Sequence, residues 1–355
     1  MKMKPNKMPL TKRILKTTGI VFLLAFVLSL IVPLPVYVEA PGMAAGLQKY
    51  IKIDGKKPKI DGQFMITSVY IWKVNGMGAI MAALNPTQDL LTASEANGGT
   101  TSENSARLNQ VYMETAVNEA KAVAFKKANV PFERDFKGIY VMGIQDNSNF
   151  KKYLHLGDTV TKIDGKQLES AAKMQKYIRK HKVGAKLTLD YTHDDQQHQA
   201  TAKTVGLLGL HDTAGIGIAL TDNVDMKSDI HVIANMGDMG GPSGGLMFSL
   251  EMYDALAPIN LANGRKIAGT GTIDAKGNVG EIGGIDKKIL AAKNSGAQIF
   301  FAPYVKPTKK ILKYEEKHMT NYQLAKATAK KYAPNLKVVP VKTFNEAVKY
   351  LETHR

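Results

Sequence analysis

The chain has 355 residues, more than one hydrophobic core usually serves, so two or three domains are expected. Its 44% hydrophobic and 22% charged residues exclude the intrinsically disordered class, and the absence of cysteine excludes disulfides, a cysteine nucleophile and thiolate metal sites. The net charge of +17 favours a solvated basic surface or attraction to anionic lipid or polymer, whereas nucleic acid is not an expected partner, because the lysines are dispersed and no zinc-finger or RNA-binding motif is present.

An uncharged apolar stretch, residues 17–38, follows a basic tail at residues 1–16. Because about 20 apolar residues let a helix cross ~30 Å of hydrocarbon, this stretch predicts a single transmembrane helix. Basic residues precede the stretch and Glu39 follows it, which predicts a cytoplasmic N-terminus and an extracellular remainder of the chain. A cleaved signal peptide ending near Ala40 is the alternative, but the run exceeds a signal-peptide core and favours an anchor retained in the cell membrane. The basic residues are Lys2, Lys4, Lys7, Lys12, Arg13 and Lys16.

Residues 39–130 are expected to form an extracytoplasmic N-terminal region. Within it, residues 63–71 are β-branched and aromatic and predict a strand. Residues 84–104 are polar and rich in turn formers, which predicts a loop. From 106 to 128 apolar residues recur at three- and four-residue spacing, which predicts an amphipathic helix that ends before Pro131.

Residues 131–205 have the pattern of a small β-rich domain. Strands are predicted at 138–142 and 159–163, a tight Asp-Gly turn follows, and a lysine-rich helix and a strand pair complete the segment. The order Gly-Ile-Tyr-Val, then Leu-x-x-Gly-Asp-x-Val-x-x-Ile-Asp-Gly, then a helix, resembles a PDZ domain of the exported-protease kind. The resemblance implies capture of an extended peptide or carboxy terminus at a sheet edge, and a plain β-rich spacer is the alternative. It places the carboxylate-binding loop at Phe136, Lys137, Gly138 and Ile139.

A glycine-rich segment, residues 236–250, surrounds Ser243 and leads into an apolar helix. At a helix start, unpaired amides and the helix dipole stabilise the negative charge that develops during acyl transfer. A helix cap and a phosphate-binding loop are alternatives, although no Gly-Lys-Ser/Thr follows the glycines. The residues expected to serve the oxyanion and the substrate backbone are Gly241, Pro242 and Gly244.

A serine nucleophile needs a base. His211 and His231 lie upstream of Ser243, yet neither belongs to a motif. A stronger candidate lies downstream, where residues 270–292 predict a strand, a turn, a second strand, a double-glycine turn and a helix that carries lysines. A Ser-His pair stays open as the alternative.

The serine segment and this block together resemble the proteolytic domain of Lon. The pattern is Pro-Ser-small-Gly, then Thr-Gly-x-Ile-x-x-x-Gly-x-Val-x-x-Ile-Gly-Gly-x-x-x-Lys without a gap, and the match covers residues 206–355. Carried over by position, the resemblance implies that Ser243 is the nucleophile and Lys288 the catalytic lysine, which Thr270 helps to hold. One departure is Gly244, where the family commonly has alanine.

A Ser-Lys dyad requires a neutral lysine. A free ammonium has a pKa of about 10.4 and cannot accept a proton near neutrality, whereas burial penalises the charged form and can lower that pKa by several units. The neutral amine of Lys288 then takes the proton of Ser243, which attacks the scissile carbonyl and forms an acyl-enzyme. The adjacent Lys287 lies about 100° around the helix and is expected to face water.

These features predict a multidomain α+β and α/β chain with a transmembrane helix, a PDZ-like domain and a Lon-type proteolytic α/β domain. The combination resembles the PDZ-containing, membrane-anchored Lon-type peptidases of Gram-positive bacteria. The sequence contains no Walker A motif, so the resemblance implies an ATP-independent serine endopeptidase that needs no cofactor or metal and cleaves exported peptides or unfolded proteins. A non-catalytic PDZ scaffold is the alternative, and the assembly state, including an oligomer, stays open.

Overall fold

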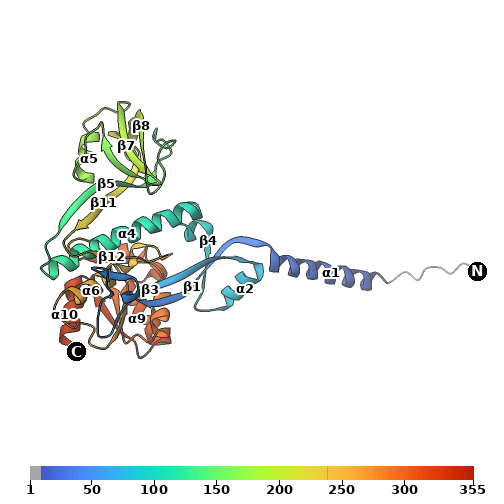
Figure 1. Ribbon diagram of the computed structural model, residues 1–355. Coiled ribbons are helices and arrows are strands. Elements are labelled where there is room, and N and C mark those ends of the chain that lie inside the picture. Colours follow the sequence, from blue (N-terminus) through green and yellow to red (C-terminus); the bar gives the residue numbers. More distant parts are fainter. Residues whose placement is uncertain (1–8, 238) are drawn as a thin grey trace, which may run out of the picture. The chain divides into compact units, whose positions relative to one another are not determined.

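The computed structural model describes residues 9–237 and 239–355. The chain, coloured from its N-terminus to its C-terminus in Figure 1, divides into two compact units. One unit holds the chain as far as Gly42 together with Val69–Thr100, and the other holds Met43–Ser68 and Thr101–Arg355. Two long strands, β1 (Pro33–Gly46) and β3 (Gln63–Asn75), contribute residues to both units.

Helix α1 (Leu10–Ile31) is long and apolar enough to cross a membrane, and its side chains are exposed. It begins at Leu10, before the expected span 17–38. It ends at Ile31, because residues 33–38 belong to β1. Proline has no amide hydrogen and disfavours a helical residue before it, so Pro33 ends the helix and Val32 adopts an extended conformation. The basic side chains of Lys12, Arg13 and Lys16 lie within the helix rather than in a tail before it.

The rest of the first unit surrounds a small core of Val38, Ala40, Val74 and Ala82. It contains α2 (Gly76–Leu84), β4 (Asp89–Thr92), which pairs antiparallel with β1, and α3 (Ala93–Ala96). The loop expected at 84–104 is therefore partly structured. Thr92 and Glu95 form a reciprocal capping box at the start of α3, a local signal that is easily overlooked in a polar segment.

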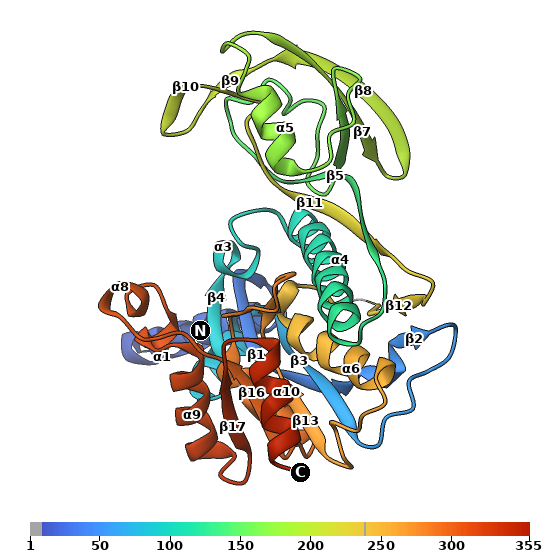
Figure 2. The same ribbon diagram turned by 90° about the vertical axis from the view of Figure 1, so that its left-hand side faces the viewer.

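A parallel sheet forms the centre of the second unit, in the order β17-β16-β13-β3 (Figure 2). Neighbouring parallel strands need long crossover connections, and in this sheet the connections contain helices. Alternate residues of each strand face opposite sides, so Phe64 and Phe301 enter one core whereas Met65 and Phe300 enter the other. The strands and crossover helices are β13 (Lys266–Gly269), β16 (Ile299–Pro303), β17 (Lys337–Val341), α7 (Ile285–Asn294) and α9 (Asn321–Tyr332).

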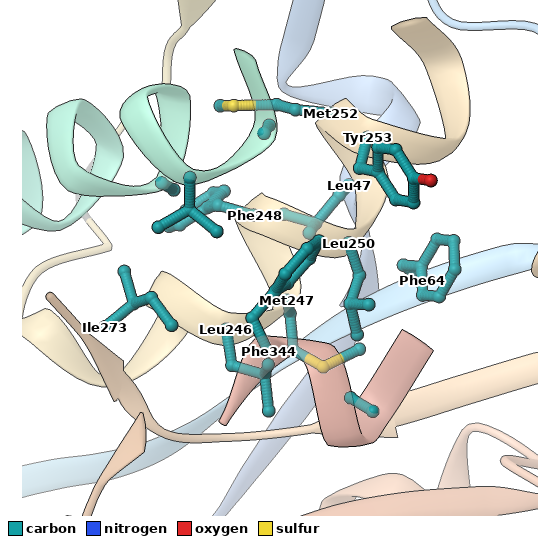
Figure 3. Close-up of a cluster of buried hydrophobic side chains, with 14 of the residues drawn as sticks. Leu47, Phe64, Leu246, Met247, Phe248, Leu250, Met252, Tyr253, Ile273 and Phe344 are labelled. Atoms are coloured by element: carbon teal, nitrogen blue, oxygen red, sulfur yellow. The ribbon is translucent and has the colours of Figure 1, made fainter. Parts of the chain in front are cut away.

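Helix α6 (Gly245–Leu256) lies in the middle of the larger core (Figure 3). It packs against α4 (Ser102–Lys127) and α10 (Phe344–Thr353), and Leu47 and Phe64 contribute to the same cluster. The expected N-terminal region 39–130 is therefore not separate from the proteolytic core. The apolar stripe of α4 explains why, since a single amphipathic helix gains about 1.5–3 kcal/mol for each large side chain that it buries against another element.

The PDZ-like segment folds as a five-stranded antiparallel sheet in the order β11-β5-β6-β7-β8, with α5 (Ala171–Ile178) packed against its core. Strand β11 lies beyond the expected end at residue 205, and it pairs with β5 from Ile218↔Ile144 to Lys227↔Glu133. The domain is thus inserted between α4 and β12 (Val232–Ala234). Its strands are β5 (Glu133–Ile144), β6 (Thr159–Ile163), β7 (Lys186–His193), β8 (Gln196–Lys203) and β11 (Ile218–Lys227).

Short elements complete the fold. They are η1 (Leu47–Lys49), β2 (Ile51–Ile53), β9 (Val205–Leu207), β10 (Leu210–Gly215), η2 (Pro242–Gly244), β14 (Thr272–Ile273), β15 (Val279–Gly280), α8 (Lys309–Leu312) and η3 (Glu316–His318).

Glu251 on α6 is fully buried, and neither of its carboxyl oxygens has a hydrogen-bond partner among the described residues. Burial, with a smaller contribution from Asp254, raises the pKa of its carboxyl to about 8. The folded state therefore holds a proton that the unfolded state releases near pH 4.5, and stability falls as the pH rises from about 4.5 to about 8.

We expect Glu251→Gln to remove this pH dependence while keeping the size of the side chain. Between pH 5 and 9 the wild type should lose about 4 kcal/mol of unfolding free energy relative to the variant. Denaturant unfolding of both proteins at several pH values measures the difference. Parallel pH profiles of the two proteins would contradict the prediction.

Candidate active site

The glycine-rich segment forms a tight turn that places Ser243 in η2, directly before α6. Gly241 has φ 93°, a conformation that favours glycine, and Pro242 occupies the first helical position, where its missing amide hydrogen costs nothing. The carbonyl oxygen of Ser243 accepts hydrogen bonds from the Gly271 amide at 2.8 Å and from Thr270 Oγ1 at 3.0 Å. The backbone around Ser243 is therefore held from the segment that follows β13.

Lys288 reaches Ser243 from the first turn of α7. Gly284 takes a left-handed conformation before the helix, and the Lys288 amide donates to its carbonyl oxygen at 3.1 Å. Lys288 Nζ lies 2.9 Å from Ser243 Oγ and 3.3 Å from Thr270 Oγ1. Lys288 is 4% exposed and Thr270 is fully buried. The structure thus brings together the three residues that the sequence pattern singled out, at the carboxyl end of β13.

Two glycines after the nucleophile allow this close packing. A Cβ on Gly245 would lie 2.9 Å from the Ile273 amide nitrogen, so only glycine lets α6 begin so close to β14. A Cβ on Gly244 would lie 2.8 Å from the Phe248 ring and would also overlap the Ile66 side chain. Ile66 therefore explains the departure at Gly244, because its side chain occupies the space where an alanine methyl would lie.

The three residues expected to serve the oxyanion have different roles in the structure. The Gly241 amide donates to the Asn109 carbonyl oxygen on α4 at 2.8 Å, and Pro242 has no amide hydrogen. Gly241 and Pro242 thus shape the turn, whereas Gly244 lies at the helix start, where amides have no intrahelical acceptor. Sequence reasoning missed Asn109, since nothing distinguishes it from other polar residues of its helix.

The expectation that Lys287 faces water is wrong. It is 2% exposed, and its Nζ lies 2.9 Å from Asp286 Oδ2, which also binds Lys317 Nζ at 2.5 Å. Burial opposes ionisation of Asp286, but the hydrogen bonds from Lys317 and Lys287 hold the pKa of its carboxyl below its usual value. The sheet and α9 both cover α7, so more than one face of this helix is buried.

The alternative bases differ from Lys288 in their surroundings. His231 is exposed and lies beside Asp54, with 3.9 Å between its Nδ1 and Asp54 Oδ1. His211 lies in β10, and its side chain is outside the described part of the structure. Among the side chains that the structure describes, Lys288 is the basic group bonded to the Ser243 hydroxyl.

The expected PDZ loop, Phe136 to Ile139, lies inside β5 rather than at a sheet edge. Strand β5 pairs with β11 along its length and with β6 at Ile139 and Tyr140, so at Ile139 it has no free edge for a peptide. A Cβ on Gly138 would collide with the Val160 carbonyl. The error arose because β11 lies about 80 residues further along the chain, beyond the reach of local pattern reasoning.

A small cavity of about 60 Å³ lies instead between α5 and the outermost strand, β11. The sequence Gly-Ile-Gly-Ile immediately before and at the start of β11 is the signal that was overlooked. The cavity is lined by Gln175, Ile178, Arg179, Leu207, Ala214, Gly215, Ile216, Gly217, Ile218 and Leu220.

The PDZ segment also carries a cluster of His155, Asp158 and His193. Their side-chain nitrogen and oxygen atoms, one from each residue, lie within 4.8 Å of one another. The buried Asp158 carboxylate binds His193 Nδ1 at 2.7 Å and accepts the His155 amide at 2.8 Å. These bonds give Asp158 a structural role in joining a loop to β7, and no metal is assigned to the group.

Comparisons with known proteins identify two domains in the chain. A family model of the PDZ domain matches residues 99–204, and one of the Lon protease (S16) C-terminal proteolytic domain matches residues 212–332. The Lon protease of Metamycoplasma arthritidis is 29% identical over 168 residues, which are 47% of this chain and 18% of the relative. The Lon protease of Heliobacterium modesticaldum is 32% identical over 90 residues, 24% of this chain and 11% of the relative. The chain thus spans less than a fifth of these relatives.

Among solved structures, the PDZ domain of an SdrC-like protein from Listeria monocytogenes is 36% identical and covers 24% of this chain and 88% of that one, with a TM-score of 0.23. The PDZ domain of an SdrC-like protein from Listeria innocua is 31% identical, covers 23% and 92%, and has the same TM-score. The two family models and the Lon relatives lead to one identification. The chain carries a PDZ domain and the C-terminal proteolytic domain of Lon (S16) serine proteases.

Proposed function

We propose that the protein is a membrane-anchored, ATP-independent serine endopeptidase that uses a dyad of Ser243 and Lys288. The observation that carries this proposal is the 2.9 Å contact between the buried Lys288 amine and the Ser243 hydroxyl at the start of a helix. A nucleophile within hydrogen-bond reach of a base is the geometry that acyl transfer requires.

The reaction begins with a neutral Lys288, a form that burial next to Ile285 and Ile289 favours. Its amine takes the proton of Ser243 Oγ as that oxygen attacks the scissile carbonyl. The resulting oxyanion lies near the first amides of the helix, those of Ser243 and Gly244. Lys288 then returns the proton to the leaving amine, and it later activates the water that releases the acyl group.

Thr270 orients the lysine in this scheme. Its hydroxyl lies 3.3 Å from Lys288 Nζ and donates to the Ser243 carbonyl oxygen at 3.0 Å. Because the hydroxyl hydrogen is engaged by that carbonyl, a lone pair of the same oxygen faces the amine. Thr270 therefore fixes the direction of the amine and the position of the serine backbone together.

An open groove of about 670 Å³ is an argument for a peptide substrate. It is lined by α4, by Val232 to Gly237 and by Met239, which lies four residues before the nucleophile in the sequence. Met113, Val117 and Met236 provide apolar surface, and Glu114 and Lys121 provide charge of both signs. This mixture suits an extended polypeptide rather than a small polar metabolite.

The PDZ domain is proposed to bind carboxy termini of substrates at the cavity between α5 and β11. Strand β11 is the outermost strand of its sheet, so a peptide can pair with it, and Arg179 and the amides around Gly215 and Gly217 suit a carboxylate. Binding of a pentapeptide with a free carboxy terminus to the full chain should be at least about tenfold tighter than binding of its amide. Isothermal titration measures both affinities, with Arg179→Ala as a control. Equal affinities would refute this site.

Helix α1 is proposed to anchor the catalytic domain at the outer face of the cell membrane. Lys12, Arg13 and Lys16 precede its apolar part, which favours a cytoplasmic N-terminus. A signal sequence near the N-terminus can also be an apolar helix. N-terminal sequencing of the protein from membranes distinguishes the two, since an anchor stays attached.

The overall proposal is tested with the full chain in detergent micelles, without nucleotide, and an unfolded protein as substrate. Mass spectrometry of the products should show new peptides that are absent with Ser243→Ala. The same comparison of peptides secreted by cells with either protein identifies natural substrates. If neither experiment shows a difference, the chain is a scaffold rather than a peptidase.

A further inference from the structure

The unit that contains α1 exposes large apolar side chains on β3 and on α2. On β3, Tyr70, Ile71 and Trp72 are consecutive and exposed, and Trp72 is 42% exposed. On α2, Ile80, Met81 and Leu84 are exposed, and Leu84 reaches 80%. Helix α2, with the sequence GMGAIMAAL, carries no charged residue. Several large apolar side chains exposed within one short segment are a candidate interaction surface.

The start of α2 is fixed to the last turn of α1 (Figure 1). Asn75 caps α2 by accepting the Gly78 amide at 2.8 Å, and its Nδ2 donates to the Leu30 carbonyl oxygen at 2.6 Å. Gly76 packs so closely on α1 that a Cβ there would lie 3.1 Å from Ser29 Cβ. The depth of the last turn of α1 in a membrane therefore sets the depth of α2.

The length of α1 gives that depth. Its uncharged part runs from Thr17 to Ile31, about 15 residues, which cover about 22 Å at 1.5 Å per residue. The hydrocarbon layer is about 30 Å thick. If the amine of Lys16 reaches the cytoplasmic boundary, the last turn of α1 still lies within the outer leaflet or at its edge. The start of α2, which packs on Ser29 and Leu30, then lies at the same depth in the membrane.

We propose that the segment from Tyr70 to Leu84 is an interfacial membrane surface, which inserts apolar side chains at the boundary between lipid headgroups and acyl chains in the outer leaflet. The proposal rests on the proposed anchoring by α1. Tryptophan and tyrosine favour this boundary, and α2 has no charged side chain that would lose hydration there. Lys73 is exposed beside Trp72 and can bind lipid phosphate.

A lipid surface fits this segment better than a second copy of the chain. Successive residues of a strand point to opposite faces, so the exposure of Tyr70, Ile71 and Trp72 leaves both faces of this strand end uncovered. Fluid lipid surrounds a strand end on all sides, whereas a protein partner covers one face.

Trp72 is the single tryptophan of the chain, so its fluorescence reports on this segment without any substitution. The full chain is reconstituted into phosphatidylcholine vesicles with or without lipids brominated near the headgroup end of the acyl chains. The brominated lipids should cause roughly a twofold loss of emission, and the emission should be shifted to the blue and protected from acrylamide. In a Trp72→Phe background, Leu84→Trp should show the same loss.

Two control variants in the Trp72→Phe background separate this proposal from the anchor. Phe22→Trp, in the middle of α1, reports insertion of the anchor, and Leu208→Trp, exposed on the PDZ domain, reports a site in water. Quenching of the Phe22→Trp variant but not of Trp72 in the wild type, with acrylamide reaching Trp72, overturns the interfacial surface and leaves the anchor intact. Absence of quenching in the Phe22→Trp variant overturns the anchor and this proposal with it. Protection of Trp72 that depends on protein concentration and not on lipid bromination identifies a second copy and also overturns the proposal.

Discussion

Replacing Lys288 with methionine is expected to lower kcat/KM for an unfolded protein substrate by about four orders of magnitude. Methionine has nearly the length of lysine and no basic group, so the buried site stays filled while the amine bonded to Ser243 Oγ is lost. The loss should appear in kcat, because the amine acts in the chemical steps. Initial rates with a quenched fluorescent peptide measure it.

Lys288→Arg separates basicity from charge. A guanidinium keeps the positive charge but cannot be deprotonated, so this variant should be as inactive as Lys288→Met. Thr270→Val should fall between the wild type and these variants, since it loosens the amine without removing it. If Lys288→Met keeps more than about a tenth of the activity, another base such as a histidine acts on Ser243.

Ser243→Ala is expected to abolish acyl-enzyme formation and to lower kcat by about 10⁴-fold or more. The Ser243 oxygen is the atom that forms the covalent bond, and alanine fits the same helical turn without it. A slowly deacylating peptide ester should add one acyl group to the wild type and none to Ser243→Ala. Intact-protein mass spectrometry shows the mass increase directly.

Ser249 provides the matched control for this experiment. It is buried on α6, the helix that directly follows Ser243, and its hydroxyl donates to the Gly245 carbonyl oxygen at 2.9 Å. Ser249→Ala should cost about 1 kcal/mol of stability and leave acylation intact. Acylation of Ser243→Ala at the wild-type rate would place the nucleophile elsewhere.

The contact between Ser243 and Lys288 was predictable because its local framework is continuous in sequence. From Thr270 to Lys288 the chain forms two short strands, two glycine turns and a helix without a gap, so the Lon pattern could be carried over by position and singled out Lys288. The neighbouring Lys287 was not predictable. Its burial depends on α9 and on Lys317, which come later in the chain, and helical periodicity cannot show that a second face is covered.

The sheets and cores of the structure cross the expected domain boundaries for a related reason. The strand at 63–66 and α4 look like parts of an N-terminal region, but their apolar residues are buried against β13 and α6, far along the sequence. Strand β11 likewise closes the PDZ sheet after an intervening hairpin. Each element was recognisable locally, whereas its neighbour in space was set by long-range burial.

The insertion of the PDZ domain also affects how the peptidase core folds. Closing a disordered loop of roughly 100 residues between α4 and β12 would cost about 4 kcal/mol of chain entropy. Once β5 and β11 have paired, Glu133 and Lys227 lie opposite each other, and the two ends of the insertion are already adjacent. A folded PDZ domain thus acts as a short tether between α4 and the nucleophile segment, and it removes the entropic barrier to their association.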